Sequence, residues 1–191
     1  MNKWDNFFST FPSIQTERLF LRQIVAADAE DLYCFYNDAK FKQYLDWNGP
    51  SSIDECLNMI DFWNRSFEEK RVLPWGISTR NNDKLIGTII IMPIRGTFED
   101  APRYPFTLAY DLEMEFWNKG FMTEALKAAL NFCKKEPDVH RIQAEVLPEN
   151  KASLRLLEKL GFHKEGLLNQ YLMHESSKTF MNVILMALLC N

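Results

Sequence analysis

The 191-residue sequence predicts a single α/β domain built around a mixed β-sheet. The length fits one domain, and 47% of the residues are apolar, which is enough for a substantial core. Segments with strand and helix periodicity interleave along the chain. A hairpin signal at residues 80–83 (RNND) joins two strands in the middle of the sequence. The sheet should therefore be mixed rather than fully parallel.

The first 50 residues predict an extension, one strand and one helix. Residues 1–15 are expected to form an N-terminal extension that packs late or not at all. Residues 18–24 alternate between apolar and other side chains, which predicts a strand. Residues 28–36 place their apolar side chains on one side of a helix.

A capping signal marks the start of the next helix. Ser52 is expected at the N-cap, with Glu55 three residues later, and the helix should run to about residue 68. The strands on either side of the hairpin turn are expected at residues 73–79 and 84–92.

The second half of the chain predicts four more strands and two helices, after a charged, proline-containing loop at residues 93–104. The expected elements are strands at 105–112, 141–147, 162–168 and 181–189, and helices at 123–135 and 150–160. No repeat, low-complexity segment or linker divides the chain. Residues 16–191 are therefore expected to form one domain.

The composition limits the classes of partner. The formal charge is −4 and the sequence pI is about 5.5, which argue against nucleic acid as the main partner. An acidic surface favours a basic acceptor instead, such as a cationic peptide or an amine.

The spacing of the cysteines and the length of the apolar runs indicate which metal sites and which cellular compartments to expect. The four cysteines are scattered without Cys-x-x-Cys spacing, so neither a metal site nor a disulfide framework is expected. Cys56 and Cys133 lie in helical patterns and should be small core residues. Residues 1–10 do not resemble a signal peptide, and the longest apolar run, 183–190, is too short to cross a bilayer. Unpaired thiols fit a reducing cytoplasm.

The most informative segment is residues 110–126 (YDLEMEFWNKGFMTEAL), in which a strand leads through a polar turn into a helix. The first N–H groups of a helix have no intrahelical acceptor, and the positive end of the helix dipole lies beside them. Gly120 lets an anion approach the backbone, and Asn118 tolerates left-handed dihedral angles. The segment therefore predicts a phosphate site, although an ordinary strand–helix connection has the same pattern.

A second segment, residues 141–162 (RIQAEVLPENKASLRLLEKLGF), completes the pattern with Asn-x-x-Ser and Leu-Gly-Phe motifs. Together with the opening residues 16–22 (TERLFLR), the two segments resemble the GNAT acetyltransferase superfamily, in particular its ribosomal-protein N-terminal acetyltransferases of the Rim type. The resemblance implies an α/β GNAT fold: a mixed, mostly antiparallel seven-stranded sheet with splayed central strands and helices on both faces. It also implies acetyl-CoA as cosubstrate and an amine acceptor.

The resemblance assigns the CoA phosphates to the backbone of one loop. These cofactor-binding residues are Asn118, Lys119, Gly120, Phe121, Met122 and Thr123. Trp117 stands where Gln or Arg is usual, Asn118 where Gly is frequent and Met122 where Gly or Ala is common. Because binding through N–H groups needs no particular side chain, these departures matter little. Lys119 adds a positive charge, or is a solvated turn residue.

In this fold the pantetheine arm lies between the splayed fourth and fifth strands. Leu112 and Met114 should pair with it on one side, and Asn150 should contact it on the other. Asn150 is equally an ideal helix N-cap, and the two roles are compatible. Ser153 corresponds to the serine near the thioester sulfur and is the first catalytic candidate, the alternative being a side chain that points to solvent.

The general base is the least defined part of the expected site. Relatives often carry a glutamate at positions that Thr107 and Leu172 occupy here. The remaining candidates are Asp111 and Glu145 on the two splayed strands, with Glu113 ranked lower. A water chain is the alternative. Tyr110 and Tyr171 are further possible donors to the thiolate, but their spacing does not distinguish them.

The acceptor pocket should come from the first two helices and from loops. The expected residues are Tyr44, Trp47, Asn48, Trp63, Trp75 and the 93–104 loop, with core packing the better interpretation for Trp63 and Trp75. A protein N-terminus is the predicted acceptor. The alternatives are a small-molecule amine (polyamine, amino acid or amino sugar) and a non-catalytic acyl-CoA-binding regulator on the same fold. The protein is expected to be a monomer or homodimer.

Overall fold

The structure is a computed structural model that describes residues 8–42, 44–45, 47–100, 104–135, 139–175 and 177–190. Within these residues the strands are β1 (Ile14–Gln15), β2 (Leu19–Gln23), β3 (Leu73–Thr79), β4 (Asn82–Pro93), β5 (Phe106–Leu112), β6 (Arg141–Val146), β7 (His163–Met173) and β8 (Phe180–Leu189). The helices are α2 (Ala29–Tyr36), α3 (Ala39–Lys42), α4 (Ile53–Glu68), α5 (Phe121–Cys133) and α6 (Lys151–Lys159), with 3-10 turns η1 (Ala26–Asp28) and η2 (Met114–Phe116).

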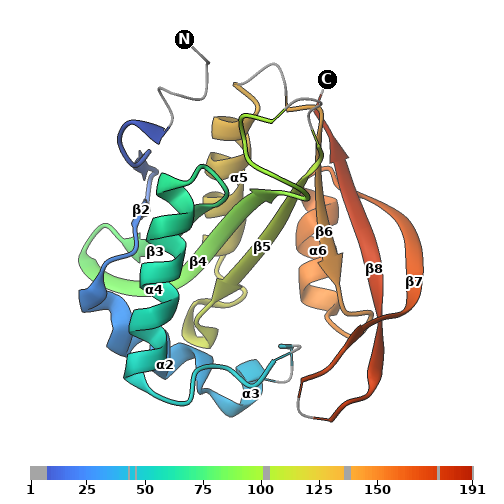
Figure 1. Cartoon of the computed structure of the whole chain (residues 1–191), viewed down its shortest axis with the longest axis horizontal. Coiled ribbons are helices and arrows are strands. Elements are labelled where there is room, and N and C mark those ends of the chain that lie inside the picture. Colours follow the sequence, from blue (N-terminus) through green and yellow to red (C-terminus); the bar gives the residue numbers. More distant parts are fainter. Residues whose placement is uncertain are drawn as a thin grey trace.

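The described strands form one eight-stranded sheet in the order β1-β2-β3-β4-β5-β6-β8-β7. Neighbours are antiparallel except β5 and β6, which are parallel. Helices α2 and α4 cover one face of the sheet and α5 and α6 the other (Figure 1). The mixed, mostly antiparallel sheet with helices on both faces is confirmed. The expected count of seven strands is corrected to eight by the two-residue strand β1.

Helix α4 begins at the predicted cap. Ser52 Oγ accepts a hydrogen bond from Glu55 N at 3.2 Å. The Glu55 carboxylate accepts from Ser51 N at 2.6 Å, one residue before the N-cap. The capping prediction is therefore confirmed on the serine side, and the glutamate bonds one residue earlier than in a standard capping box.

The N-terminal segment packs on the sheet where the structure describes it. Strand β1 pairs with β2, and the buried Trp75 indole donates to Pro12 O at 2.6 Å. For residues 8–15 the expectation of no packing is therefore wrong, while residues 1–7 lie outside the described range. The domain division at residue 16 stays a prediction.

Strand β7 continues five residues beyond the expected end at residue 168. Its pairing with β8 shifts register between Leu168 and Leu172, and Gln170 has a φ of 52°. This irregularity interrupts the alternation on which strand prediction depends. The longer hairpin of β7 and β8 brings Tyr171 beside β6.

The core lies on both faces of the sheet. One buried cluster joins the sheet to α5 and α6, and a smaller one joins it to α2, α3 and α4. Cys56 and Cys133 are buried core residues, as predicted, and burial raises their thiol pKa values to about 11 and about 12. Among the described helices, none has the length and apolar character needed to cross a membrane.

Candidate active site

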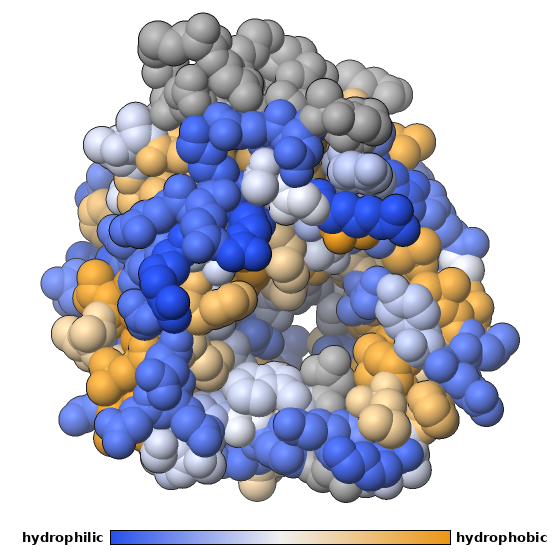
Figure 2. All heavy atoms as spheres, in the orientation of Figure 1, coloured by the Kyte–Doolittle hydropathy of each residue, from blue (hydrophilic) through white to orange (hydrophobic). Residues whose placement is uncertain are grey.

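A cavity opens where β5 and β6 separate. The two strands pair only at Phe106↔Ile142 and Thr107↔Gln143, and beyond these pairs they diverge. The cavity has a volume of about 1020 Å³ and is lined by β5, β6, α6 and the start of α5. Figure 2 shows it as a deep opening near the middle of the face. The predicted splay of the central strands is therefore confirmed.

Helix α5 presents unpaired N–H groups to this cavity. Gly120 is the N-cap with a φ of 81°, Asn118 has a φ of 58°, and no side chain caps the helix. The first helical bond runs from Glu124 N to Gly120 O at 3.1 Å. The N–H groups of residues 121–123 have no acceptor among the described residues. This start of α5 has the features of an anion site.

The N-terminal motif holds the α5 turn in place. Arg18 Nε pairs with Glu124 Oε2 at 2.6 Å, and Arg18 Nη1 donates to Lys119 O at 3.1 Å. Thr16 Oγ1 donates to Glu124 Oε1 at 2.6 Å. Burial opposes ionisation of Glu124, but the bonds from Thr16 and Arg18 outweigh it and lower the pKa of this carboxyl. Residues 16–18 therefore fix the turn that precedes α5, although they are far from it in the sequence.

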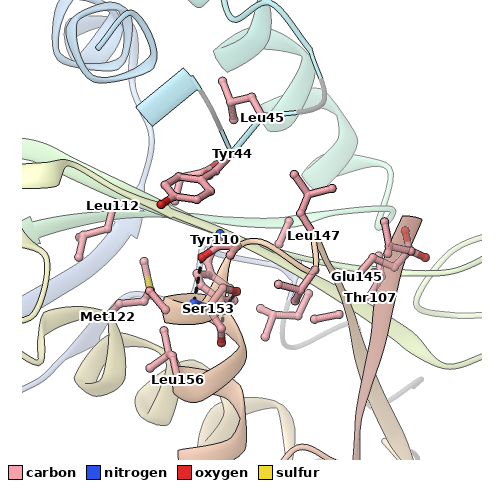
Figure 3. Close-up of a pocket in the computed structure, with 18 of the residues that line it drawn as sticks. Tyr44, Leu45, Thr107, Tyr110, Leu112, Met122, Glu145, Leu147, Ser153 and Leu156 are labelled. Atoms are coloured by element: carbon pink, nitrogen blue, oxygen red, sulfur yellow. Dashed lines mark hydrogen bonds between the residues drawn. The ribbon is translucent and has the colours of Figure 1, made fainter. Parts of the chain in front are cut away.

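Ser153 lines the cavity, and both its backbone and its hydroxyl have hydrogen-bond partners. Its N–H donates to Asn150 Oδ1 at 3.0 Å, which confirms Asn150 as the N-cap of α6. Its Oγ lies 2.6 Å from Tyr110 Oη, as the dashed line in Figure 3 marks. Burial raises the pKa of Tyr110 well above its usual range, so the phenol keeps its proton at neutral pH. The contact with Ser153 therefore distinguishes Tyr110 from Tyr171 as a candidate donor, whereas the spacing of the two residues in the sequence did not.

The two candidate bases differ in their surroundings. Asp111 Oδ2 accepts from the buried Tyr36 Oη at 2.8 Å and lies 3.5 Å from Thr88 Oγ1. Glu145 is exposed, and its Oε1 accepts from Tyr171 Oη at 2.8 Å. Glu145 Oε2 has no hydrogen-bond partner among the described residues.

The lower ranking of Glu113 agrees with its position. Its carboxylate pairs with Lys84 Nζ at 2.8 and 3.0 Å, and it does not line the large cavity. Thr107 and Leu172, the two positions at which the resemblance led us to look for a glutamate, both line the cavity.

Most of the predicted site residues meet in this one cavity. Those that line it are Asp111, Leu112, Asn118, Gly120, Phe121, Met122, Thr123, Glu145, Asn150 and Ser153. Figure 3 shows Leu112 and Met122 on one side of the Tyr110–Ser153 pair and Glu145 on the other.

Two predicted cofactor-binding residues do not line the cavity. Met114 belongs to η2, because the chain leaves the strand after Leu112, and its side chain faces a separate hollow of about 190 Å³ beside α2. The exposed Lys119 places its ammonium 6.0 Å from the Phe116 ring. In addition, the Leu112 carbonyl accepts from the Trp117 indole at 2.6 Å, so this carbonyl is already paired.

The expected acceptor residues divide into two groups. Tyr44 and Trp47 line the cavity, as do the first residues of the 93–104 loop. Trp75 is fully buried and Trp63 packs against the smaller core cluster, so both are core residues, as preferred. Within the loop, residues 101–103 lie outside the described range.

Asn48, which was also expected in the acceptor pocket, makes a backbone hydrogen bond. Asn48 N donates to Glu175 Oε2 at 2.8 Å, which links the segment before α4 to the β7–β8 hairpin. Asn48 itself does not line the cavity.

Sequence reasoning missed the two cations of the cavity, Arg155 and Lys159 on α6. They are its lining cations among the described residues, as Asp111 and Glu145 are its lining carboxylates. The basic i, i+4 spacing on the helix that carries Ser153 was a usable signal, since such residues share a helix face.

Known proteins with similar sequences and structures are acetyltransferases. The model of the acetyltransferase (GNAT) domain matches residues 18–163. YoaA of Bacillus subtilis, an uncharacterized N-acetyltransferase, is 35% identical over 91% of this chain and 95% of its own length. The ribosomal protein uS5-alanine N-acetyltransferase of Escherichia coli is 30% identical over 86% of each chain. RimJ of Mycobacterium smegmatis, solved in complex with CoA-disulfide, superposes with a TM-score of 0.76 at 22% identity, over 90% of this chain and 81% of that one.

Proposed function

The chain belongs to the GNAT acetyltransferase family, and from this premise we propose that it transfers acetyl from acetyl-CoA to the free amine of a protein N-terminus. The observation that carries the proposal is the division of charge in the cavity. Unpaired α5 N–H groups and two α6 cations form its anion-binding part, and Asp111 and Glu145 supply its carboxylates. An anionic donor and a cationic amine therefore each have a complementary surface.

The residues around the α5 turn fit acetyl-CoA. The N–H groups of residues 121–123 supply donors for phosphate oxygens, and a glycine at the N-cap leaves their approach open. The volume of about 1020 Å³ lies at the upper end of the range for ligand sites. When bound, acetyl-CoA supplies an acetyl group activated as a thioester.

Ser153 and Tyr110 form the proton-donating pair of the proposed site. Tyr110 Oη keeps its proton and lies 2.6 Å from Ser153 Oγ, and in the proposed site it is the donor of this hydrogen bond. The hydroxyl proton of Ser153 then remains available for a sulfur atom on which negative charge develops. A donor aimed at developing charge stabilises the transition state more than the bound ground state.

Glu145 and Asp111 act on the acceptor amine. Glu145 Oε2 has no partner among the described residues, so it accepts the proton that the amine must lose. Asp111, held by Tyr36 and Thr88, attracts and orients the ammonium form on arrival. These contacts support Glu145 as the base and an anchoring role for Asp111.

The choice of a protein N-terminus is supported by the uS5-alanine N-acetyltransferase of Escherichia coli, which is 30% identical over 86% of each chain. The second candidate is a small-molecule amine. It is supported by the two carboxylates of the cavity, which attract any ammonium group regardless of what it is attached to.

An acceptor screen that detects free thiol tests the proposal. The panel contains the N-terminal peptide of uS5, the same peptide with a blocked N-terminus, and polyamines, amino acids and amino sugars. We expect release of CoA thiol with the free peptide and none with the blocked one. Release with small amines alone would replace the proposed acceptor by the second candidate.

A further inference from the structure

The sheet divides the cavity into two halves, because successive side chains of a strand point to opposite faces. Asp111 of β5 bonds Tyr36 of α2, whereas its neighbour Tyr110 bonds Ser153 of α6 on the other face. Glu145 of β6 lies between two residues of the core cluster that joins the sheet to α5 and α6, so its own side chain points to the α2 side. Both lining carboxylates therefore belong to the half of the cavity on the α2 side.

Aromatic side chains form one wall of this α2-side half. Figure 3 shows Tyr44 and Ser153 on opposite sides of the strands. The aromatic wall is a series of rings in which neighbouring centroids lie 5.4, 5.7, 6.4 and 5.8 Å apart: Trp47, Tyr36, Phe41, Trp117 and Tyr44. All of them except the buried Tyr36 line the cavity. Tyr36 connects the wall to a carboxylate, since its hydroxyl donates to Asp111 at 2.8 Å.

The charges of the cavity are separated between its two halves. Arg155 and Lys159 are its lining cations among the described residues, and both belong to α6, on the face opposite α2. The α2-side half contains Asp111 and Glu145 beside the aromatic wall. Ring faces and carboxylates both attract positive charge, so this half is suited to a cation.

The aromatic wall favours one kind of cation over another. A ring face attracts a cation without needing an N–H group on it. A primary ammonium is strongly hydrated and has three donors to satisfy, while Asp111 Oδ2 and Glu145 Oε1 already accept from tyrosines. A quaternary ammonium has no donors, and its methyl groups gain free energy when they are buried. The wall therefore suits an ammonium group whose charge is surrounded by carbon.

We propose that the α2-side half of the cavity binds quaternary ammonium compounds, which lie against the aromatic wall with Asp111 balancing their charge. A quaternary nitrogen has no lone pair and cannot accept an acetyl group, so such a compound should compete with the amine acceptor. The competition rests on the proposed function, because it requires the acceptor to occupy the same half. The binding itself requires neither acetyl-CoA nor turnover.

Ligand-observed NMR titration without acetyl-CoA tests the binding site. The probes are choline, its neutral isostere 3,3-dimethylbutanol and its primary analogue ethanolamine. The wild-type protein should bind choline at least about tenfold more tightly than either of the others. The isostere has the shape of choline but lacks the charge, and the primary amine has the charge but lacks the methyl groups.

Variants of the wall and of the carboxylate locate the site. Trp47→Leu, Tyr44→Leu and Asp111→Asn should each weaken choline binding about threefold to tenfold and leave 3,3-dimethylbutanol binding nearly unchanged. Trp47→Phe should retain most of the affinity, because it keeps a ring face. Tyr33→Leu is the matched control, since Tyr33 packs on the smaller core cluster but does not line the cavity, and it should bind choline like the wild type. Unfolding midpoints show which variants are folded at the temperature of the titration, and Tyr44→Leu removes a partly exposed ring if Trp47→Leu is unstable.

Two results would overturn the inference. One is equal wild-type affinity for choline and 3,3-dimethylbutanol, because the site would then recognise shape without charge. The other is choline binding that persists unchanged in folded Tyr44→Leu and Asp111→Asn proteins, because the cation would then lie elsewhere.

A competition experiment separates this inference from the proposed function. Tetramethylammonium chloride should raise KM for the acceptor found in the thiol-release screen without changing kcat, and sodium chloride at the same concentration is the control for ionic strength. If amines are acetylated and choline does not bind, the proposed function stands and this inference alone is refuted. If choline binds with the expected preference and no amine is acetylated, the cation site stands and the proposed function fails.

Discussion

At the residue scale, one position joins helix capping to the proposed chemistry. Ser153 N bonds the cap residue Asn150, and Ser153 Oγ bonds Tyr110. The cap fixes the backbone of the first α6 turn, and the phenol fixes the hydroxyl rotamer. The serine is therefore oriented before any ligand binds, as a donor to developing charge requires.

Removing the Ser153 hydroxyl should lower turnover more than affinity. We expect Ser153→Ala to reduce kcat by about tenfold to hundredfold, with little change in KM for acetyl-CoA, because the bond forms only as charge develops on sulfur. Tyr110→Phe should have a smaller effect in the same direction. Tyr33→Phe on α2, whose ring packs on the smaller core cluster, is the control and should match the wild type. A Ser153→Ala enzyme with wild-type kcat would refute this role.

The two carboxylates should differ in the pH dependence of turnover. A base must be ionised to accept a proton, so kcat rises with pH through its pKa, and Glu145→Gln should abolish that acidic limb. Asp111→Asn should keep the limb and raise KM for the acceptor. CoA affinity should be unchanged in both variants. If both keep the limb and the full rate, the proton leaves to water instead.

At the element scale, the α5 turn depends on backbone conformation more than on side-chain identity. Gly120 has a φ of 81°, and a Cβ there would lie 3.5 Å from Arg18 Nη2, which is an ordinary contact. The protein itself thus has room for a side chain. The constraints are the left-handed backbone, which costs about 1–2 kcal/mol for other residues, and the space that a phosphate needs.

Substitutions in the turn should separate backbone from charge. Gly120→Val should weaken CoA binding by at least about tenfold while the protein remains folded, since a β-branched residue disfavours this conformation and blocks the N–H groups. Lys119→Ala should change the affinity much less, because the exposed Lys119 does not line the cavity. Unaltered CoA binding by Gly120→Val would locate the phosphates elsewhere.

The link from residues 16–18 to α5 should make stability depend on pH. The pKa of Glu124 is lowered in the folded state, so its ionised form stabilises the fold above the unfolded value of about 4.3. This stabilisation disappears as pH falls through the folded pKa. Glu124→Gln should therefore lose about 1 kcal/mol at pH 7, a figure reduced for the partial exposure of the Arg18 partner, and nothing near pH 2. A constant difference in denaturant midpoints across this range would contradict the assignment.

Local patterns predicted the elements well where one short signal decides them. Ser52 and Glu55 predicted the start of α4, and the glycine turn predicted α5 to within two residues. Strand β1 was missed because two residues carry no periodicity, and the end of β7 was missed because Gln170 interrupts its alternation.

At the scale of the whole molecule, the site is assembled by contacts between distant segments. The bond between Thr16 and Glu124 joins residues 108 positions apart, and that between Tyr36 and Asp111 joins residues 75 apart. No local pattern encodes such pairs. The sequence could therefore predict the family and the loop of the proposed phosphate site, but neither the surroundings of the carboxylates nor the cations of α6.

The central claim is that the cavity between β5 and β6 binds acetyl-CoA, and thermal unfolding tests it most directly. At acetyl-CoA about 100 times its dissociation constant, the folded state should gain about 2.7 kcal/mol, which raises the midpoint by about 5–10 °C for a chain of this size. The midpoint should also rise with ligand concentration. No shift at millimolar acetyl-CoA, in a protein that unfolds cooperatively, would contradict the claim.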